Sequence, residues 1–207
     1  MMPDLSFVHR YVPGSSKFTV LVLHGTGGNE DDLLPLAREV VPSANLLSPR
    51  GQVLEHGMPR FFRRLAMGVF DEQDLKRRAK ALAAFVPEAA AAYKFDASRV
   101  YALGYSNGAN IAAAVLLLHP GALAGGALLR AVLPLEPASP PSLEGKPVLI
   151  AAGADDPYSD RSRVEALSDR LAGGGANVEL RWAQRGHELG ADELDTVRDW
   201  FRRQGMQ

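Results

Sequence analysis

Cysteine is absent from the 207-residue chain. Its absence excludes disulfide frameworks, cysteine-based zinc sites, redox-active thiol pairs and thiol nucleophiles. An excess of charge of one sign is also missing, because 23 lysines and arginines are balanced by 24 aspartates and glutamates. Nucleic acid and anionic membrane surfaces are therefore not expected as the main partners. The hydrophobic share of 46% is ordinary for a globular protein and excludes wholesale disorder.

Long hydrophobic runs are equally scarce, with one exception at residues 109–129, which include no Asp, Glu, Lys or Arg. Length alone would permit a membrane span there. However, His-Pro-Gly at 119–121 is typical of a helix end, and a Gly-Gly pair follows at 125–126. We therefore expect a buried helix followed by a buried strand. Because residues 1–14 also lack the apolar core of a signal peptide, we expect a soluble, cytoplasmic protein without stable membrane association.

Two hydrophobic periodicities alternate along the chain. Short apolar runs predict strands at 18–23, 99–103, 126–133, 146–152 and 178–182. Helical spacing predicts helices at 31–40, 72–93, 108–119, 161–171 and 191–203. Strands that alternate with helices indicate an α/β fold with a mostly parallel, doubly wound sheet and helices on both faces. The length and the absence of a linker predict a single domain over residues 1–207.

The sequence Gly104-Tyr105-Ser106-Asn107-Gly108 lies between a predicted strand and a predicted helix. A sharp strand-to-helix turn of this kind forces its central residue into a strained conformation and requires small residues on either side of it. The turn exposes the Ser106 hydroxyl at the positive end of a helix. Ser106 is therefore the candidate nucleophile.

A serine hydroxyl needs a base, and the base needs a carboxylate that orients it. Of the two histidines that follow Ser106, His119 is expected to end the helix that Ser106 begins, whereas His187 lies in a loop after a predicted strand. His187 is thus the candidate base. The loop after the strand at 146–152 offers Asp155 and Asp156. We favour Asp156, because the proline that follows it fixes an extended turn, and Asp155 remains the alternative. Asp160 is expected to cap the next helix.

A serine hydrolase also needs backbone N–H groups that bind the oxyanion of the tetrahedral intermediate. The residue after the nucleophile, Asn107, supplies one candidate N–H. The second is Thr26, in the glycine-rich loop His24–Gly28 after the first predicted strand, where glycines allow close approach of the backbone to a substrate. The loop has neither a G-x-G-x-x-G pattern nor a Walker lysine, which argues against phosphate binding.

The segments HGTGGNEDDLLPLA, GYSNGANIAAAVLLLHP, AAGADDP and GHELG together resemble the phospholipase/carboxylesterase branch of the α/β-hydrolase superfamily. This branch comprises small bacterial serine esterases related to acyl-protein thioesterases, and the resemblance covers residues 17–204. It implies a single-domain α/β-hydrolase fold with Ser106, Asp156 and His187 at the catalytic positions. The main chain of Thr26 and Asn107 takes the oxyanion positions by the same resemblance.

The segments SPRG at 48–51 and GMPRFF at 57–62 resemble a pocket-side loop of the same branch. Met58, Arg60, Phe61 and Phe62 are therefore candidate pocket residues, with ordinary core packing as the alternative for the apolar three. Arg60, Arg63 and Arg64 are expected mainly on a solvated face, with contact to an acidic substrate as the alternative.

The sequence favours a serine carboxylesterase that hydrolyses small, short-acyl esters through an acyl-enzyme on Ser106. Its expected partner is a small-molecule ester, without cofactor or metal, and a homodimer is left open. One alternative is a thioesterase or lysophospholipase that acts on longer acyl chains. The other is a catalytically idle hydrolase fold that serves as a binding protein, which the presence of Ser106, Asp156 and His187 argues against.

Overall fold

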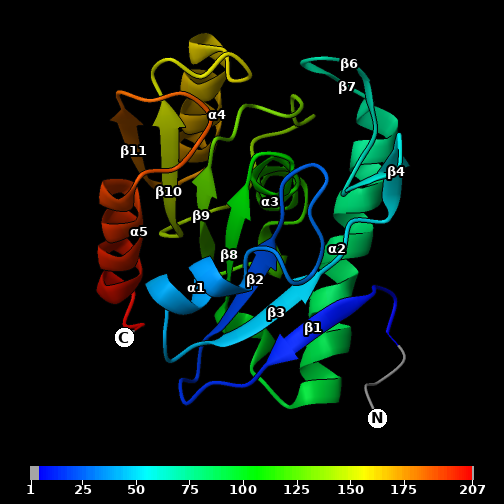
Figure 1. Ribbon diagram of the computed structural model, residues 1–207, viewed down its shortest axis with the longest axis vertical. Helices are drawn as coiled ribbons and strands as arrows, with labels where there is room; N and C mark the ends of the chain where they lie inside the picture. The colour runs from blue at the N-terminus through cyan, green and yellow to red at the C-terminus, as the bar shows by residue number, and fades with distance from the viewer. Residues whose placement is uncertain (1–4, 207) are drawn as a thin grey trace.

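The computed structural model describes residues 5–206, and its centre is a seven-stranded sheet (Figure 1). The strands of this sheet are β1 (His9–Val12), β2 (Thr19–Leu23), β3 (Asn45–Pro49), β8 (Val100–Tyr105), β9 (Gly125–Leu129), β10 (Pro147–Gly153) and β11 (Asn177–Ala183). Their order is β1-β3-β2-β8-β9-β10-β11. The edge strand β1 is antiparallel to β3, and the other neighbouring pairs are parallel. The predicted α/β class with a mostly parallel sheet is confirmed.

Helices cover both faces of the sheet (Figure 1). They are α1 (Leu34–Val40), α2 (Glu72–Tyr93), α3 (Asn107–Leu118), α4 (Arg161–Gly173) and α5 (Ala191–Arg203), with short 3-10 turns at Ala97–Arg99 and Pro120–Ala122. The first and last helices, α1 and α5, pack on one face, and α2, α3 and α4 pack on the other. As predicted, Asp160 caps α4, because its carboxylate accepts hydrogen bonds from the N–H groups of Ser162 and Arg163.

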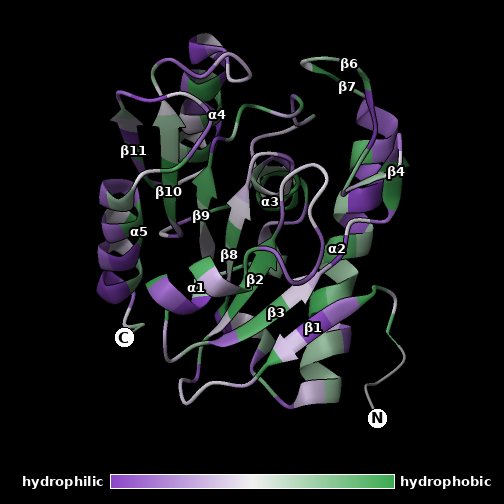
Figure 2. Ribbon diagram, viewed as in Figure 1, coloured by the Kyte–Doolittle hydropathy of each residue, from purple (hydrophilic) through white to green (hydrophobic). Residues whose placement is uncertain are grey.

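The inner strands β2, β9 and β10 are apolar because both faces of the sheet are buried there, and Figure 2 colours them mainly as hydrophobic. In β2 successive side chains enter opposite cores. Leu21 and Leu23 pack with α2, α3 and α4, whereas Val20 and Val22 pack with α1 and α5. This double burial explains why the strand sequences are continuous apolar runs.

Residues 109–129 form most of α3 followed by β9, as predicted from the His-Pro-Gly sequence between them. The side chains of α3 from Asn107 to Leu117 are buried. Within residues 5–206, no helix combines the length and the apolar character needed to cross a membrane.

Several elements depart from the sequence-based boundaries. The predicted strand 126–133 ends at Leu129, because Arg130 takes a positive φ of 60° and leaves the sheet. The predicted helix 31–40 begins at Leu34, since Asn29 and Asp31 form turns before it.

Six short strands were not predicted. Two of them, β1 and β3, extend the main sheet, and four form small hairpins outside it: β4 (Val53–Glu55) with β5 (Met58–Arg60), and β6 (Arg64–Ala66) with β7 (Val69–Phe70). The hairpin strands are three residues or fewer, and all but β7 mix a charged with apolar side chains, so no strand periodicity develops.

Candidate active site

The candidate catalytic residues come from loops at one edge of the sheet. Ser106 follows β8, Asp156 follows β10 and His187 follows β11, while Thr26 follows β2. These four strands are parallel, so their carboxyl ends lie at the same edge. The topology therefore brings together residues that are up to 161 positions apart in the sequence (Thr26 to His187).

Ser106 occupies the strained turn that its sequence predicts. Its backbone has φ 53° and ψ −112°, and its N–H donates to Leu129 O at 2.8 Å, which ties the turn to β9. The glycines on either side are required by close backbone contacts. A Cβ on Gly104 would lie 2.6 Å from Gly108 O, and a Cβ on Gly108 would lie 2.0 Å from Leu23 O. The backbone of the turn can approach β2 and α3 this closely only because both positions are glycine.

Ser106, His187 and Asp156 form a continuous chain of hydrogen bonds. The Ser106 Oγ lies 2.9 Å from His187 Nε2, and His187 Nδ1 lies 2.8 Å from Asp156 Oδ2. The rings of Tyr105 and Tyr158 lie 5.3 Å and 5.0 Å from the imidazole and confine it. This is the geometry in which a carboxylate orients an imidazole that takes the proton of a serine hydroxyl.

The carboxylate of Asp156 is held in its charged form. Burial by itself would raise the pKa of Asp156, but hydrogen bonds from His187, Tyr158 N–H and Ser159 outweigh that effect and lower the pKa. Its side chain is fully buried. The alternative acid, Asp155, is exposed and donates its backbone N–H to Arg185 O. The structure thus brings Asp156, and not Asp155, to His187.

The two candidate oxyanion residues line the same cavity as the nucleophile. Asn107 is the first residue of α3, where an N–H has no partner within the helix. Thr26 lies on the same cavity as Ser106. Within residues 5–206, the backbone N–H of neither residue donates a hydrogen bond. Both groups are therefore free to bind a substrate oxygen.

The loop that carries Thr26 is braced by His24, a residue to which sequence analysis gave no role. Gly51 N–H donates to His24 Nε2 at 2.9 Å, so Nε2 carries no proton and Nδ1–H donates to Gly25 O at 2.7 Å. Burial lowers the pKa of His24 and favours this neutral form. The imidazole thereby fixes the start of the glycine-rich loop to the segment after β3.

A cavity of about 370 Å³ opens in front of Ser106. Of the four candidate pocket residues, the structure places Arg60 on its described lining. Phe61 and Phe62 are buried in the hydrophobic core, which was the alternative stated for them, and Met58 is 40% exposed outside the cavity. Phe70 and Met67, which were not predicted, line the cavity instead. Arg60 is buried rather than on a solvated face.

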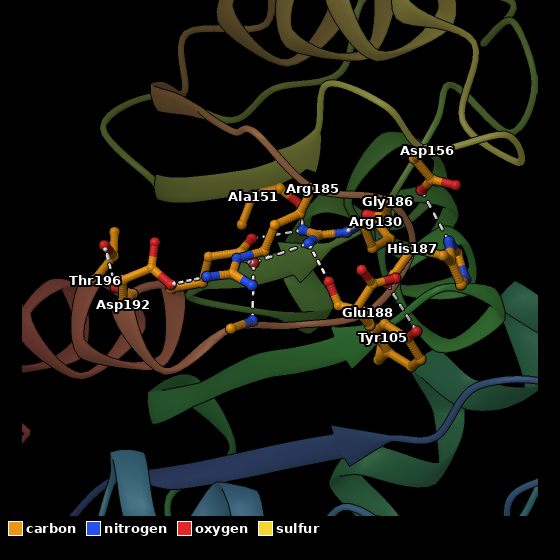
Figure 3. Close-up of polar contacts among 12 residues, drawn as sticks. Tyr105, Arg130, Ala151, Asp156, Arg185, Gly186, His187, Glu188, Asp192 and Thr196 are labelled. Carbon is orange, nitrogen blue, oxygen red and sulfur yellow. Dashed lines mark hydrogen bonds and ion pairs between the residues drawn. The ribbon is translucent and has the colours of Figure 1, made fainter.

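A further residue that was not predicted, Arg130, holds the loop that carries His187 (Figure 3). Its guanidinium is fully buried and pairs with Glu193 of α5 through two hydrogen bonds of 2.7 and 2.9 Å. It also donates to Gly186 O at 3.0 Å and to Glu188 O at 2.6 Å, the carbonyls on either side of His187. Tyr105 Oη donates to His187 O at 3.0 Å. These bonds fix the backbone on both sides of the candidate base.

We expect Arg130→Met to lower the free energy of unfolding by about 3–5 kcal/mol, because the buried Glu193 carboxylate loses its closest cation and keeps only the Gly190 N–H and the more distant Arg185 Nε, at 3.9 Å. The double variant Arg130→Met/Glu193→Leu removes that carboxylate and should recover most of the stability. The kcat of the double variant should nevertheless stay about tenfold or more below that of the unmodified protein, because a displacement of the base by about 1 Å slows the reaction strongly. Thermal melts and kcat measured on the same samples separate the two effects.

The matched control is Arg181→Gln, on β11 before this loop, because Arg181 is 63% exposed and pairs with Glu179 rather than with Glu193. It should behave like the unmodified protein. Full activity in the double variant would show that Arg130 only stabilises the fold.

Within the described part of the chain, no group of three or more histidines and carboxylates is arranged to hold a metal ion. The site has instead a hydroxyl, an imidazole, a carboxylate and two free N–H groups. Such a site at the carboxyl edge of a parallel sheet defines a hydrolase of the α/β type.

Comparison with known proteins identifies the family. The chain is 45% identical over 194 residues to "Putative hydrolase MhqD" of Bacillus subtilis (strain 168), which covers 94% of this chain and 97% of the relative. A carboxylesterase structure from Bacillus cereus is 47% identical, with a TM-score of 0.91 and 94% of this chain and 92% of that chain covered. A carboxylesterase from Mesorhizobium loti is 35% identical, with a TM-score of 0.91 and 97% of each chain covered. No protein-family model matches the chain.

The chain therefore belongs to the phospholipase/carboxylesterase branch of the α/β-hydrolase superfamily. It is an ester hydrolase.

Proposed function

We propose that the protein is a serine carboxylesterase that hydrolyses small, short-acyl esters through an acyl-enzyme on Ser106. The observation that carries this proposal is the chain of hydrogen bonds from Ser106 to His187 to Asp156. Ser106 Oγ lies 2.9 Å from His187 Nε2, and His187 Nδ1 lies 2.8 Å from Asp156 Oδ2. The free N–H groups of Thr26 and Asn107 beside the hydroxyl support it further.

The reaction proceeds in two halves. Ser106 Oγ attacks the ester carbonyl carbon while His187 Nε2 accepts the hydroxyl proton, and the carbonyl oxygen becomes an oxyanion between the N–H groups of Thr26 and Asn107. The C–O bond of the ester then breaks as His187 gives the proton to the departing alcohol. In the second half, water attacks the acyl-enzyme with His187 again as base, and the acid leaves as Ser106 recovers its proton.

Asp156 stabilises the imidazolium that forms in each half of the reaction. Because hydrogen bonds hold the pKa of Asp156 below its usual value, the carboxylate stays charged throughout the neutral range. His187 accepts the serine proton in its neutral form.

The cavity volume favours short acyl groups, because about 370 Å³ is near the lower end of the range for small-molecule sites. One observation favours the second candidate, a thioesterase or lysophospholipase with longer acyl substrates. Leu65, Met67 and Val69 are 71%, 62% and 51% exposed, and Met67 lies on the described lining of the cavity. This hairpin offers an apolar surface that a longer chain would cover.

Rates on p-nitrophenyl esters of increasing acyl length distinguish the two candidates. We expect kcat/KM to be highest from acetate to butyrate and to fall by about tenfold or more at decanoate, since the cavity cannot enclose the extra methylenes. Steady-state rates below the critical micelle concentration give this profile. A kcat/KM that rises up to decanoate would contradict the short-acyl proposal and support the longer-chain alternative.

A further inference from the structure

The cavity in front of Ser106 carries positive charge that its walls do not balance. Arg60, Arg64 and Arg130 lie on its described lining, which includes no aspartate or glutamate. Arg130 is already neutralised by Glu193 and donates its remaining hydrogen bonds to backbone carbonyls. The charge available to a ligand therefore resides on Arg60 and Arg64.

These two arginines share one carboxylate. Glu55, on the same β4–β5 hairpin as Arg60, lies 3.2 Å from Arg60 Nε and 2.8 Å from Arg64 Nη2. Two guanidinium groups and one carboxylate leave one net positive charge at this wall. Arg64 is 22% exposed and Arg60 only 3% exposed, so water screens this charge poorly.

The buried partner, Arg60, has hydrogen-bonding capacity to spare. Its Nη1 donates to Thr26 Oγ1 at 2.6 Å and its Nε donates to Phe62 O at 3.2 Å, but Nη2 finds no hydrogen-bond acceptor within residues 5–206. Burial, together with repulsion from Arg64, lowers the pKa of Arg60. A buried cation that shares its counterion is energetically costly, and an anion that enters the cavity relieves that cost.

We propose that the esters preferred by this site carry a carboxylate close to the ester group, and that Arg60 and Arg64 bind it. This inference rests on the proposed esterase function. Because Arg60 contacts the side chain of Thr26, a candidate oxyanion residue, the bound carboxylate lies next to the reacting carbonyl. The planar guanidinium fork matches a carboxylate. One net positive charge balances a singly charged carboxylate and does not balance a doubly charged phosphate.

Two pairs of esters test the proposal on either side of the ester bond. On the acyl side, p-nitrophenyl hydrogen glutarate is compared with p-nitrophenyl pentanoate, in which a methyl group replaces the carboxylate. On the alcohol side, p-acetoxybenzoate is compared with its methyl ester. The readout is the ratio of kcat/KM for the anionic ester to kcat/KM for the neutral ester, after spontaneous hydrolysis is subtracted.

In Arg64→Gln, Glu55 neutralises Arg60 alone, so the wall loses its net charge. We expect the ratio to fall by about tenfold in at least one pair, the size expected for a charge-assisted hydrogen bond. Arg64→Lys keeps the charge and should retain most of the ratio. The matched control is Arg63→Gln. Arg63 is 61% exposed, pairs with Asp71 and is not on the described lining of the cavity. The ratio of kcat/KM for the anionic and neutral esters should therefore be the same in Arg63→Gln as in the unmodified protein.

An unchanged ratio in Arg64→Gln for both pairs overturns the proposal. If the protein hydrolyses none of the four esters, the proposed function fails, and a binding measurement then decides the inference separately. Monomethyl glutarate, which carries one carboxylate and one ester group, should raise the melting temperature of Ser106→Ala, and the added substitution Arg64→Gln should remove that rise. The absence of any such rise would also count against a carboxylate site.

Discussion

Ser106→Ala should abolish ester hydrolysis, with a loss in kcat of about 10⁴-fold or more, and leave the protein folded. The substitution removes the proposed nucleophile and creates no core cavity, because Ser106 lies at the cavity in front of the sheet edge. Alanine has the same Cβ as serine, so the backbone strain at φ 53° is unchanged. The free energy of unfolding should therefore change by no more than about 1–2 kcal/mol.

The measurement combines turnover of p-nitrophenyl acetate with labelling by a fluorophosphonate probe, on protein cleared of contaminating esterases. The unmodified protein should be labelled on Ser106, and the variant should not. Retained turnover in the variant would remove Ser106 from the mechanism. If the unmodified, folded protein is neither labelled nor active, the chain is better described as a hydrolase fold used for binding.

The second large effect is expected for Asp156→Asn, with a loss in kcat of about 10⁴-fold, which is the size of the effect when the equivalent aspartate is changed to asparagine in a serine protease. The amide N–H₂ of asparagine would face His187 Nδ1 and leave the imidazole proton on Nε2. In that tautomer Nε2 cannot accept the proton of Ser106. The fold should survive, because the asparagine oxygen can still accept the hydrogen bond from Tyr158 N–H, now 2.9 Å from Asp156 Oδ1.

Asp155→Asn is the matched control, since Asp155 is adjacent in sequence but exposed. It should lower kcat by less than about tenfold, as expected for a surface position. Turnover and thermal melts of both variants should be recorded side by side. A severe loss in Asp155→Asn together with normal rates in Asp156→Asn would reverse the assignment of the acid.

Much of the fold could be predicted because the relevant signals are local. The strand predicted to end at Leu103, which extends to Tyr105 in the structure, and the helix that starts beside Ser106 are each apolar enough to identify, and the glycines around Ser106 specify a turn. The chain order of nucleophile, acid and histidine then restricts the other candidates to loops after later strands. The choice of Asp156 over Asp155 followed from one proline, and the distance of 2.8 Å to His187 agrees with it.

The residues that support the site could not be predicted in the same way. In the sequence, Arg130 lies within the predicted strand 126–133, and its partner Glu193 is 63 positions away on an amphipathic helix. His24 reads as one polar residue in a glycine-rich loop. The pairing of Arg60 and Arg64 with Glu55 depends on two hairpins too short to show a period. These contacts are long-range, so only the assembled fold brings the groups together.

The positive φ of Ser106 limits how stable this protein can become. A residue with a Cβ in such a conformation costs about 1–3 kcal/mol, and the cost persists only because the neighbouring strands and α3 impose it. Glycine would release it, but glycine carries no hydroxyl. A substitution at this position therefore cannot raise the stability of the protein without loss of the hydroxyl. Stabilising substitutions must occur elsewhere, for example on the exposed helix surfaces. The turn that presents the hydroxyl is thus a built-in trade-off between activity and stability.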